Sequence, residues 1–449
     1  MRDAHAHLRK MNVTKGLDEN AKIRAGIDCK YNTRLQAGRG KTPFQPATQV
    51  SSTLVEGNTG RNEIIAVFTG NKLCTKCSRR IQKGENTQHE GSCSANIAED
   101  QTIGAEGLWA KKLMEQVLED PETAVRIGYL TSDGDSHAAD GISEAQKEQV
   151  ENLIDTRHFA ESIARSIEKL CFSKDAFPGC TAVDRSRMQK SLAHNVKRRC
   201  EAEYQAAYKR YNGNVCTIKN KLTYATDAMM SCYNGKCGKP CQKHSLVCDG
   251  KGRGAWQHDY LEDGMRPLSL SKEDMHNLRH CITLRLGKEG IDRTKFNTNT
   301  QSIEAAHRSY TSNNPQQVTM SRNFPARVHA AVHKLNHGIA NSILKKLEYL
   351  KVPLRPQTRP CHALKRMQNC ERLRALRQKS SALKMQRAEK RRRLHKLHSE
   401  KRARRKQEDI YKKGLLLAQT KSVKHDHLYT SRKEHFDHNY HLRSKVTYQ

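Results

Sequence analysis

The chain has 449 residues, of which 36% are hydrophobic and only 5% aromatic, so parts of it are expected to bury little core. Its 81 Lys and Arg against 47 Asp and Glu give a formal net charge of +34, which favours a polyanionic partner such as DNA or RNA. No window approaches the ~20 apolar residues of a membrane-spanning helix, and the first residues lack an apolar signal core. These features argue against a membrane partner and indicate a nuclear or cytosolic setting.

Apolar and β-branched runs in the first third of the chain predict strands. RNEIIAVFTG, from Arg61, and VRIGYLTSDG, from Val125, both end in turn-forming residues. Between them, GAEGLWAKKLMEQVLED, from Gly104, places its apolar side chains on one helical face. The stretches 143–170 and 184–211 are predicted to be helical. The front part is therefore predicted to be α+β.

The last fifth of the chain is strongly basic. From Arg355 onward, 28 Lys and Arg stand against 8 Asp and Glu, and no Gly or Pro occurs between Glu371 and Asp409. This composition predicts a basic helical or disordered tail with few apolar residues. KRRRLHK, from Lys390, and KRARRK, from Lys401, are typical of nuclear-localisation or nucleic-acid-binding segments, and a solvated charged arm explains them equally well.

Three acidic residues far apart in the sequence are candidates for a metal site. Asp28 and Asp133 follow apolar, strand-like runs, whereas Glu304 lies in a helix-like stretch. Two-metal phosphodiester chemistry requires carboxylates that hold two ions about 4 Å apart, and Mg²⁺ prefers hard oxygen ligands. Asp135 would lie on the same face as Asp133 if the strand continued. Taken alone this signal is weak, because most Asp residues in turns are caps or solvated and SDGD by itself is usually a turn.

Fifteen cysteines in a chain without a secretion signal favour zinc ligands or buried thiols over disulfides. The first group has the spacing of a tetrahedral zinc site that would clamp a loop beside a strand; it consists of Cys74, Cys77, His89 and Cys93. The second group offers five ligands for four positions, and a metal-free loop of reduced cysteines is the alternative; its members are Cys232, Cys237, Cys241, His244 and Cys248.

Ten blocks occur in an order that resembles the Mutator-like transposase domain of animal mobile elements, over most of residues 20–345. These are DCKYNTR, NKLCTKC, HEGSCSANI, IGAEGLWAKKL, YLTSDGDSHAADGI, DTRHFAESI, SCYNGKC, HSLVC, TQSIEAAHRSY and FPARVHAAVHKLNHGIANSI. The family is similar to DDE transposases, which have an RNase H-like core. The resemblance implies that Asp28, Asp133 and Glu304 are catalytic and bind Mg²⁺ or Mn²⁺. It also implies that Asp155-x-x-His158 is a motif that supports the catalytic site or contacts the DNA at the element end. We predict that Asp135 and His158 help to bind the metal cofactor.

The resemblance also implies a domain plan with an RNase H-like mixed sheet and flanking helices. The expected parts are 1–142 as the first part of the core, 143–295 as a helical, cysteine-rich insertion, 296–354 as the last part of the core with the Glu helix, and 355–449 as the tail. Two motifs depart from the family pattern. Cys29 follows Asp28 in place of Gly, and 301–303 reads Gln-Ser-Ile, where the family has Thr-Lys before the Glu.

We therefore expect a DDE-type DNA transposase, in the nucleus, that cuts and joins DNA strands, with DNA as partner and homo-oligomerisation left open. This expectation includes a domesticated or truncated descendant of such a transposase. The alternative is a catalytically inactive nuclear DNA-binding or chromatin protein derived from a transposase. A basic RNA-associated protein acting through the tail alone ranks below both.

Overall fold

The computed structural model describes residues 1–32, 47–72, 74–85, 93–98, 101–251, 268–315, 318, 320, 322–352, 355 and 357–426. The chain divides into two compact units, Met1–Val352 and Pro353–Gln449. None of the helices in the described residues combines the length and the hydrophobicity of a membrane-spanning segment.

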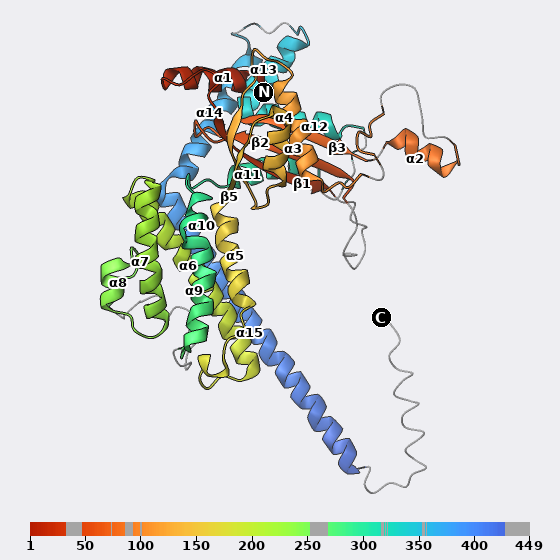
Figure 1. Cartoon of the computed structure of the whole chain (residues 1–449). Helices are drawn as coiled ribbons and strands as arrows, with labels where there is room; N and C mark the ends of the chain where they lie inside the picture. The colour runs from red at the N-terminus through yellow and green to blue at the C-terminus, as the bar shows by residue number, and fades with distance from the viewer. Residues whose placement is uncertain are drawn as a thin grey trace. The chain divides into compact units, whose positions relative to one another are not determined.

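Five strands of the first unit form one mixed sheet in the order β3-β2-β1-β4-β5 (Figure 1). The central strand β1 pairs antiparallel with β2 and parallel with β4, and each of these carries one outer strand. The runs predicted from Arg61 and Val125 are the strands β3 and β4. The α+β class is confirmed. The strand bounds are Ile23–Asn32 for β1, Gln49–Glu56 for β2, Ile64–Asn71 for β3, Ile127–Ser132 for β4 and Glu151–Ile154 for β5.

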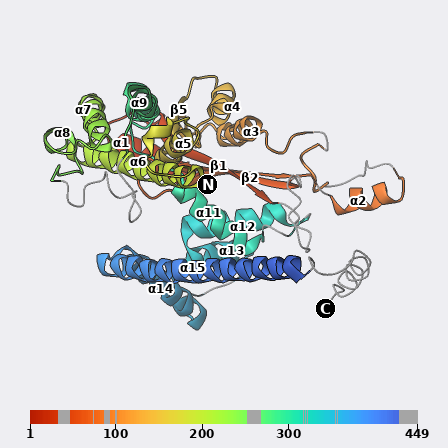
Figure 2. The same cartoon turned by 90° about the horizontal axis from the view of Figure 1, so that it is seen from below.

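Helices cover both faces of the sheet (Figure 2). On one face, α3 buries the apolar stripe that its sequence predicts, and Trp109 stacks on Phe68 of β3 with ring centroids 5.1 Å apart. On the other face, Ile303 and Tyr310 of α11 pack with Val55 and with Phe324 of α12. The helix bounds are Arg2–Thr14 for α1, Thr75–Gln82 for α2, Glu106–Leu118 for α3, His137–Gln146 for α4, Gln301–Asn313 for α11, Phe324–His337 for α12 and Ile339–Tyr349 for α13.

The helices α3 and α4 touch backbone to backbone where two glycines meet. A Cβ atom on Gly141 would lie 2.0 Å from the carbonyl oxygen of Gly107, and no side-chain rotation can relieve a clash with a backbone atom. We expect Gly141→Ala to lower the free energy of unfolding by about 1–3 kcal/mol, measured by urea denaturation. Gly104→Ala is the control, because its nearest neighbour lies 4.0 Å away. Equal losses in both variants would contradict this packing.

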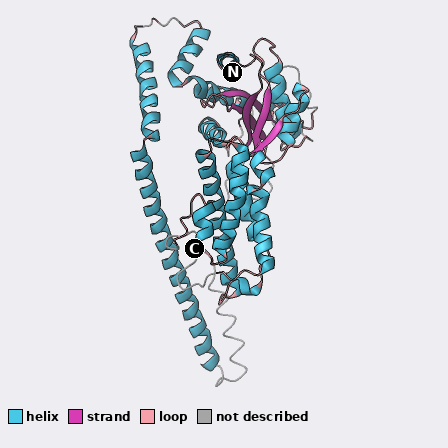
Figure 3. Ribbon diagram, turned by 60° about the vertical axis from the view of Figure 1, so that its left-hand side comes forward, coloured by secondary structure: helices cyan, strands magenta, loops and turns pink. Residues whose placement is uncertain are grey.

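A helical segment lies between the last strand and α11, and its helices run side by side below the sheet in Figure 3. Apolar residues such as Ile163, Leu192, Leu222 and Ile282 give it a core of its own. The helix bounds are Thr156–Glu168 for α5, Ala182–Arg210 for α6, Val215–Tyr233 for α7, Lys239–His244 for α8, Lys272–Leu286 for α9 and Lys288–Asp292 for α10, with a short 3₁₀ turn at Lys174–Ala176.

The prediction of an unbroken helix over 143–170 is wrong. Helix α4 ends where Lys147 adopts a left-handed conformation with φ 55°, and the four residues of β5 follow before α5 begins. In β5, Leu153 pairs with Thr131 and Ile154 with Ser132 of β4. The strand forms because β4 offers a free parallel edge, a tertiary cause that helix propensity does not register.

Asp274 fixes the start of α9 by a set of hydrogen bonds to its carboxylate. The side chain is buried, and it accepts bonds from the backbone N–H and hydroxyl of Ser173, at 2.8 and 2.6 Å, and from the same groups of Ser271, at 3.1 and 2.8 Å. Burial alone would raise the pKa of Asp274, but these four bonds outweigh burial and lower it below its ordinary value.

A carboxyl whose pKa falls on folding stabilises the fold above its unfolded pKa of about 4 and loses that contribution as the pH falls through its folded pKa. We therefore expect Asp274→Asn to lower the free energy of unfolding at pH 7 by about 1–3 kcal/mol. Urea unfolding at pH 7, 5 and 3 should show the gap between wild type and variant shrinking below about pH 4. The exposed Asp175→Asn is the control; a gap constant with pH would contradict the assignment.

The second unit consists of two helices in its described part, α14 (Arg359–Lys379) and α15 (Ser381–Asp426). Its apolar residues are sparse and mostly exposed, as expected for solvated basic helices. The exposed ones include Leu373, Leu376, Met385 and Leu394. The segment therefore presents its charge to solvent along a helix.

Candidate functional site

Asp28 lies inside β1, not at its end as the sequence suggested. Side chains alternate along a strand, so Asp28 and Lys30 point to the face that α11 covers. The carboxylate Oδ2 of Asp28 is 3.3 Å from Nδ1 of His307. Lys30 Nζ donates to the carbonyl oxygen of His307 at 3.2 Å and to the hydroxyl of Thr311 at 2.6 Å. Burial lowers the pKa of Lys30 to about 8. Helix α11 therefore runs along β1 at the level of Asp28.

Asp133 follows directly after β4. Gly26 of β1 pairs with Thr131 of β4, and continuing this parallel register brings Asp28 and Asp133 to the same level of the sheet. The Oδ1 atom of Asp133 is 3.4 Å from Nε2 of His158. The pKa of Asp133 is raised, first by burial and also by the charge of Asp28, while His158 acts in the opposite direction. The negative charge of Asp28 therefore acts on Asp133.

Glu304 occupies the first turn of α11. Its Oε2 is 3.1 Å from Nη2 of Arg308, one turn further on, and 4.0 Å from Nη1 of Arg157. Arg157 and His158 are neighbours in the first turn of α5, so one short segment contacts both Glu304 and Asp133. Three elements far apart in the sequence, β1, the end of β4 and α11, deliver their acidic residues to one region.

The three carboxylates do not close to the spacing of a single-ion site. Among the described residues, groups of three or more ligand atoms all within 4.8 Å of one another are found only among cysteines. A pair of ions about 4 Å apart, each with ligands about 2 Å away, spans a wider set of oxygens. What supports a two-ion site is therefore that the three carboxylates lie in one region and share neighbouring side chains.

His307 is a site residue that sequence reasoning missed, and Glu106 is an acidic residue near the site. His307 follows Glu304 by three positions, the spacing that places two side chains on one helical face, and its Nε2 lies 3.2 Å from the hydroxyl of Thr53. Glu106, at the start of α3, accepts a hydrogen bond from the hydroxyl of Tyr31 at 2.7 Å. Burial raises its pKa, and the charges of Asp135, Asp28 and Asp133 raise it further. Only the Glu304-x-x-His307 spacing was a usable signal.

Asp135 does not lie on the strand, because β4 ends at Ser132. The backbone carbonyl of Asp135 accepts bonds from the Ser132 hydroxyl at 3.1 Å and from the Asn152 amide at 2.6 Å. These bonds shape the turn that carries Asp133.

Asp155 is buried and joins the helical segment to α11. It is the N-cap of α5, where its Oδ1 accepts from the backbone N–H of Arg157 at 2.6 Å. Its Oδ2 accepts from the backbone N–H and the hydroxyl of Thr300, at 2.7 and 2.6 Å. Thr300 is the N-cap of α11, four residues before Glu304. Asp155 therefore sets the position of the Glu304 helix relative to the His158 helix.

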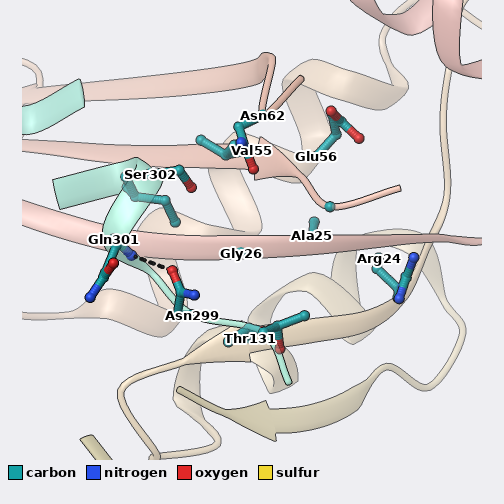
Figure 4. Close-up of a pocket in the computed structure, with 13 residues that line it drawn as sticks. Arg24, Ala25, Gly26, Val55, Glu56, Asn62, Thr131, Asn299, Gln301 and Ser302 are labelled. Atoms are coloured by element: carbon teal, nitrogen blue, oxygen red, sulfur yellow. Dashed lines mark hydrogen bonds between the residues drawn. The ribbon is translucent and has the colours of Figure 1, made fainter. Parts of the chain in front are cut away.

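A cavity of about 410 Å³ lies beside the start of α11 (Figure 4). Gln301 and Ser302 line it, and the backbone N–H of Gln301 donates to the side chain of Asn299 at 3.1 Å. Among its lining residues, Arg24 is the one cation and Glu56 the one anion. This wall therefore lacks the basic residue that the resemblance expects just before the Glu.

The first cysteine group is brought together in space. The sulfur atoms of Cys74, Cys77 and Cys93 lie within 4.8 Å of one another, and those of Cys77 and Cys93 are 3.7 Å apart. The predicted fourth ligand, His89, lies outside the described residues. Three thiolates at this spacing suit a soft or borderline ion such as Zn²⁺.

The second cysteine group resolves into four sulfur ligands. Cys232, Cys237, Cys241 and Cys248 converge within 4.8 Å, and three of the four are buried. His244 is not in the group; its ring stacks on Tyr224 with centroids 5.2 Å apart. The group fits a tetrahedral Zn²⁺ site held by the end of α7, the loop after it, α8 and the loop that follows α8.

Comparison with known proteins adds one match. A family model described as Mutator-like transposase matches residues 1–248, more than half of the chain. That span holds the five strands, Asp28, Asp133 and both cysteine groups, and Glu304 lies beyond it. No curated protein and no solved structure matches the chain.

Proposed function

The chain belongs to the Mutator-like transposase family, and from that membership we propose that it is a DDE-type DNA transposase, or a descendant of one, that cuts and joins DNA with Asp28, Asp133 and Glu304. Its partner is DNA, and its place is the nucleus. The observation that carries the proposal is the convergence of β1, the end of β4 and α11 on one region, through the contacts of His307 and His158 with the two aspartates.

The proposal assigns the first unit an RNase H-like core interrupted by a helical insertion. The strand order β3-β2-β1-β4-β5 supports it, with β1 antiparallel to β2 and parallel to β4. A late helix, α11, packs along β1 on the face of Asp28, and the helical segment of α5 to α10 separates β5 from that helix. The start and end of this segment are tied together, since Ile154 N donates to Arg293 O at 2.8 Å.

The carboxylates fit Mg²⁺ or Mn²⁺ because they are hard oxygen donors. Burial and the charge of Asp28 raise the pKa of Asp133, so its negative charge lacks full compensation and a bound cation would stabilise it. Two such ions would activate the attacking oxygen and stabilise the leaving one. His307 of α11 would orient the carboxylate of Asp28 on β1, and His158 of α5 would orient that of Asp133 after β4. Arg157 and Arg308 meet Glu304 and would also attract a DNA phosphate. Asp155 fixes the helices that carry these groups.

Basic helices and the cysteine groups complete the proposal. The formal charge of +34, concentrated in the second unit, gives sequence-independent DNA affinity that falls steeply with salt. Runs such as KRRRLHK, from Lys390, would direct nuclear import. Zn²⁺ at the two cysteine groups is structural in this proposal, clamping the loop after β3 and the end of α7.

The direct test is nicking of supercoiled plasmid by the purified full chain. We expect relaxed circles to appear with Mg²⁺ or Mn²⁺, and none with a chelator. Salt should inhibit steeply through DNA binding. DNA binding without any metal-dependent cutting would overturn the enzymatic proposal.

That outcome would favour the second candidate, a catalytically inactive DNA-binding or chromatin protein built on the same fold. Two observations favour it. Glu304 is paired with Arg308 at 3.1 Å, and the 301–303 stretch carries no basic residue. Cutting in the plasmid assay would exclude it.

A further inference from the structure

A fully buried guanidinium lies beside the second cysteine group. Arg199, on α6, is 0% exposed, and its Nη2 is 3.6 Å from the sulfur of Cys241 and 3.5 Å from the hydroxyl of Ser245. Its Nε and Nη1 have no hydrogen-bond partner in the described part of the chain. A buried cation with unused donors is costly unless a negative charge compensates it.

The nearest carboxylate compensates Arg199 only in part. Glu203, also 0% exposed, has its Oε1 3.6 Å from Nε of Arg199, too far for a strong hydrogen bond. Glu203 instead accepts bonds from the hydroxyl of Ser245 and from the backbone N–H of Leu246, the latter at 2.7 Å. The carboxylate is thus used to hold the loop between α8 and Cys248, and the guanidinium keeps free donors next to sulfur.

The ligand set determines how much charge must be balanced. Because His244 stacks on Tyr224 and all four ligands are cysteines, a bound divalent ion with four thiolates carries a net charge of about −2. A mixed set with histidine would carry about −1. A buried centre with this charge is stabilised by a cation held close to its sulfurs.

We propose that Arg199 is the charge partner of a divalent metal bound by Cys232, Cys237, Cys241 and Cys248, and that it sets the affinity of that site. In this role Arg199 is a positioning residue for the metal centre, and Glu203 opposes it by adding negative charge nearby. The inference rests on the zinc site and not on DNA cutting, so its test and the plasmid assay fail independently.

The test measures Zn²⁺ affinity of the full chain by competition with a chromogenic chelator, in a Cys77→Ser, Cys93→Ser background that removes the first group. Substitution with Co²⁺ gives a sulfur-to-cobalt charge-transfer band that reports thiolate ligation at the remaining site. We expect Arg199→Met to weaken Zn²⁺ binding about 10–100-fold and Arg199→Lys to weaken it less. Glu203→Gln should tighten binding, because it removes a negative charge.

The opposite signs of the two variants distinguish an electrostatic role from a general loss of packing. Tyr233→Phe is the uncharged control, since it removes a buried hydroxyl that donates to Asn195 and leaves the ring beside Arg199 and all charges in place. Its Zn²⁺ affinity should match wild type. If Arg199→Met does not fold, Glu203→Gln decides: tighter binding supports the proposal. Unchanged or weaker binding in Glu203→Gln, or wild-type affinity in Arg199→Met, overturns it.

Discussion

Asp133→Asn is expected to slow metal-dependent nicking by the full chain at least about 10³-fold while DNA affinity stays unchanged. The neutral amide removes one charge from the carboxylate group that would hold the ions. The side chain of Asp133 is 55% exposed, so the substitution should not unfold the protein. Rates would come from time courses of plasmid relaxation, with DNA affinity measured in parallel by fluorescence anisotropy.

Asp140→Asn is the matched control for Asp133→Asn, because it removes the same charge from an exposed position on α4. Its nicking rate should equal that of wild type. Equal rates for Asp133→Asn and wild type would show that any cutting arises elsewhere on the molecule.

Asp155→Ala is expected to lower the free energy of unfolding by about 3 kcal/mol or more. The substitution removes three hydrogen bonds to one buried carboxylate and leaves the donors of Arg157 and Thr300 unsatisfied. It also releases the start of α11, so nicking should fall together with stability. Urea denaturation gives the first quantity and plasmid relaxation the second.

Asn214→Ala provides the comparison for Asp155→Ala. Asn214 is the exposed N-cap of α7, and its side chain accepts one hydrogen bond from the backbone N–H of Thr217 at 3.0 Å. Losing this bond should lower the free energy of unfolding by about 1 kcal/mol and leave nicking unchanged. A similar small effect for Asp155→Ala would mean that Asp155 is an ordinary cap and not a link between helices.

Local patterns were enough to predict several elements. The β-branched runs from Arg61 and Val125 form β3 and β4, and the apolar stripe from Gly104 forms α3. These elements are predictable because the spacing of apolar residues shows which face of an element is buried. The cysteine spacing likewise predicted that Cys232 and Cys241 belong to one group, and their sulfur atoms lie together in the structure. In each case the residues that interact are close in sequence or share a simple period.

Features that depend on distant partners could not be predicted in this way. The strand β5 forms because it can pair with the edge of β4. His244 lies outside the metal group, and its ring stacks on Tyr224, twenty residues earlier. The link from Asp155 to Thr300 spans 145 positions. His307 looked like an ordinary helix residue until α11 was seen to run along β1 and bring it to Asp28.

The most direct test of the acidic site is Mn²⁺ binding by the DNA-bound full chain, followed by electron paramagnetic resonance. We predict that wild type binds about two Mn²⁺ ions per chain in the presence of DNA, and that Asp28→Asn, Asp133→Asn and Glu304→Gln each lose at least one. The same Mn²⁺ stoichiometry in wild type and all three variants would contradict a metal site built from these carboxylates.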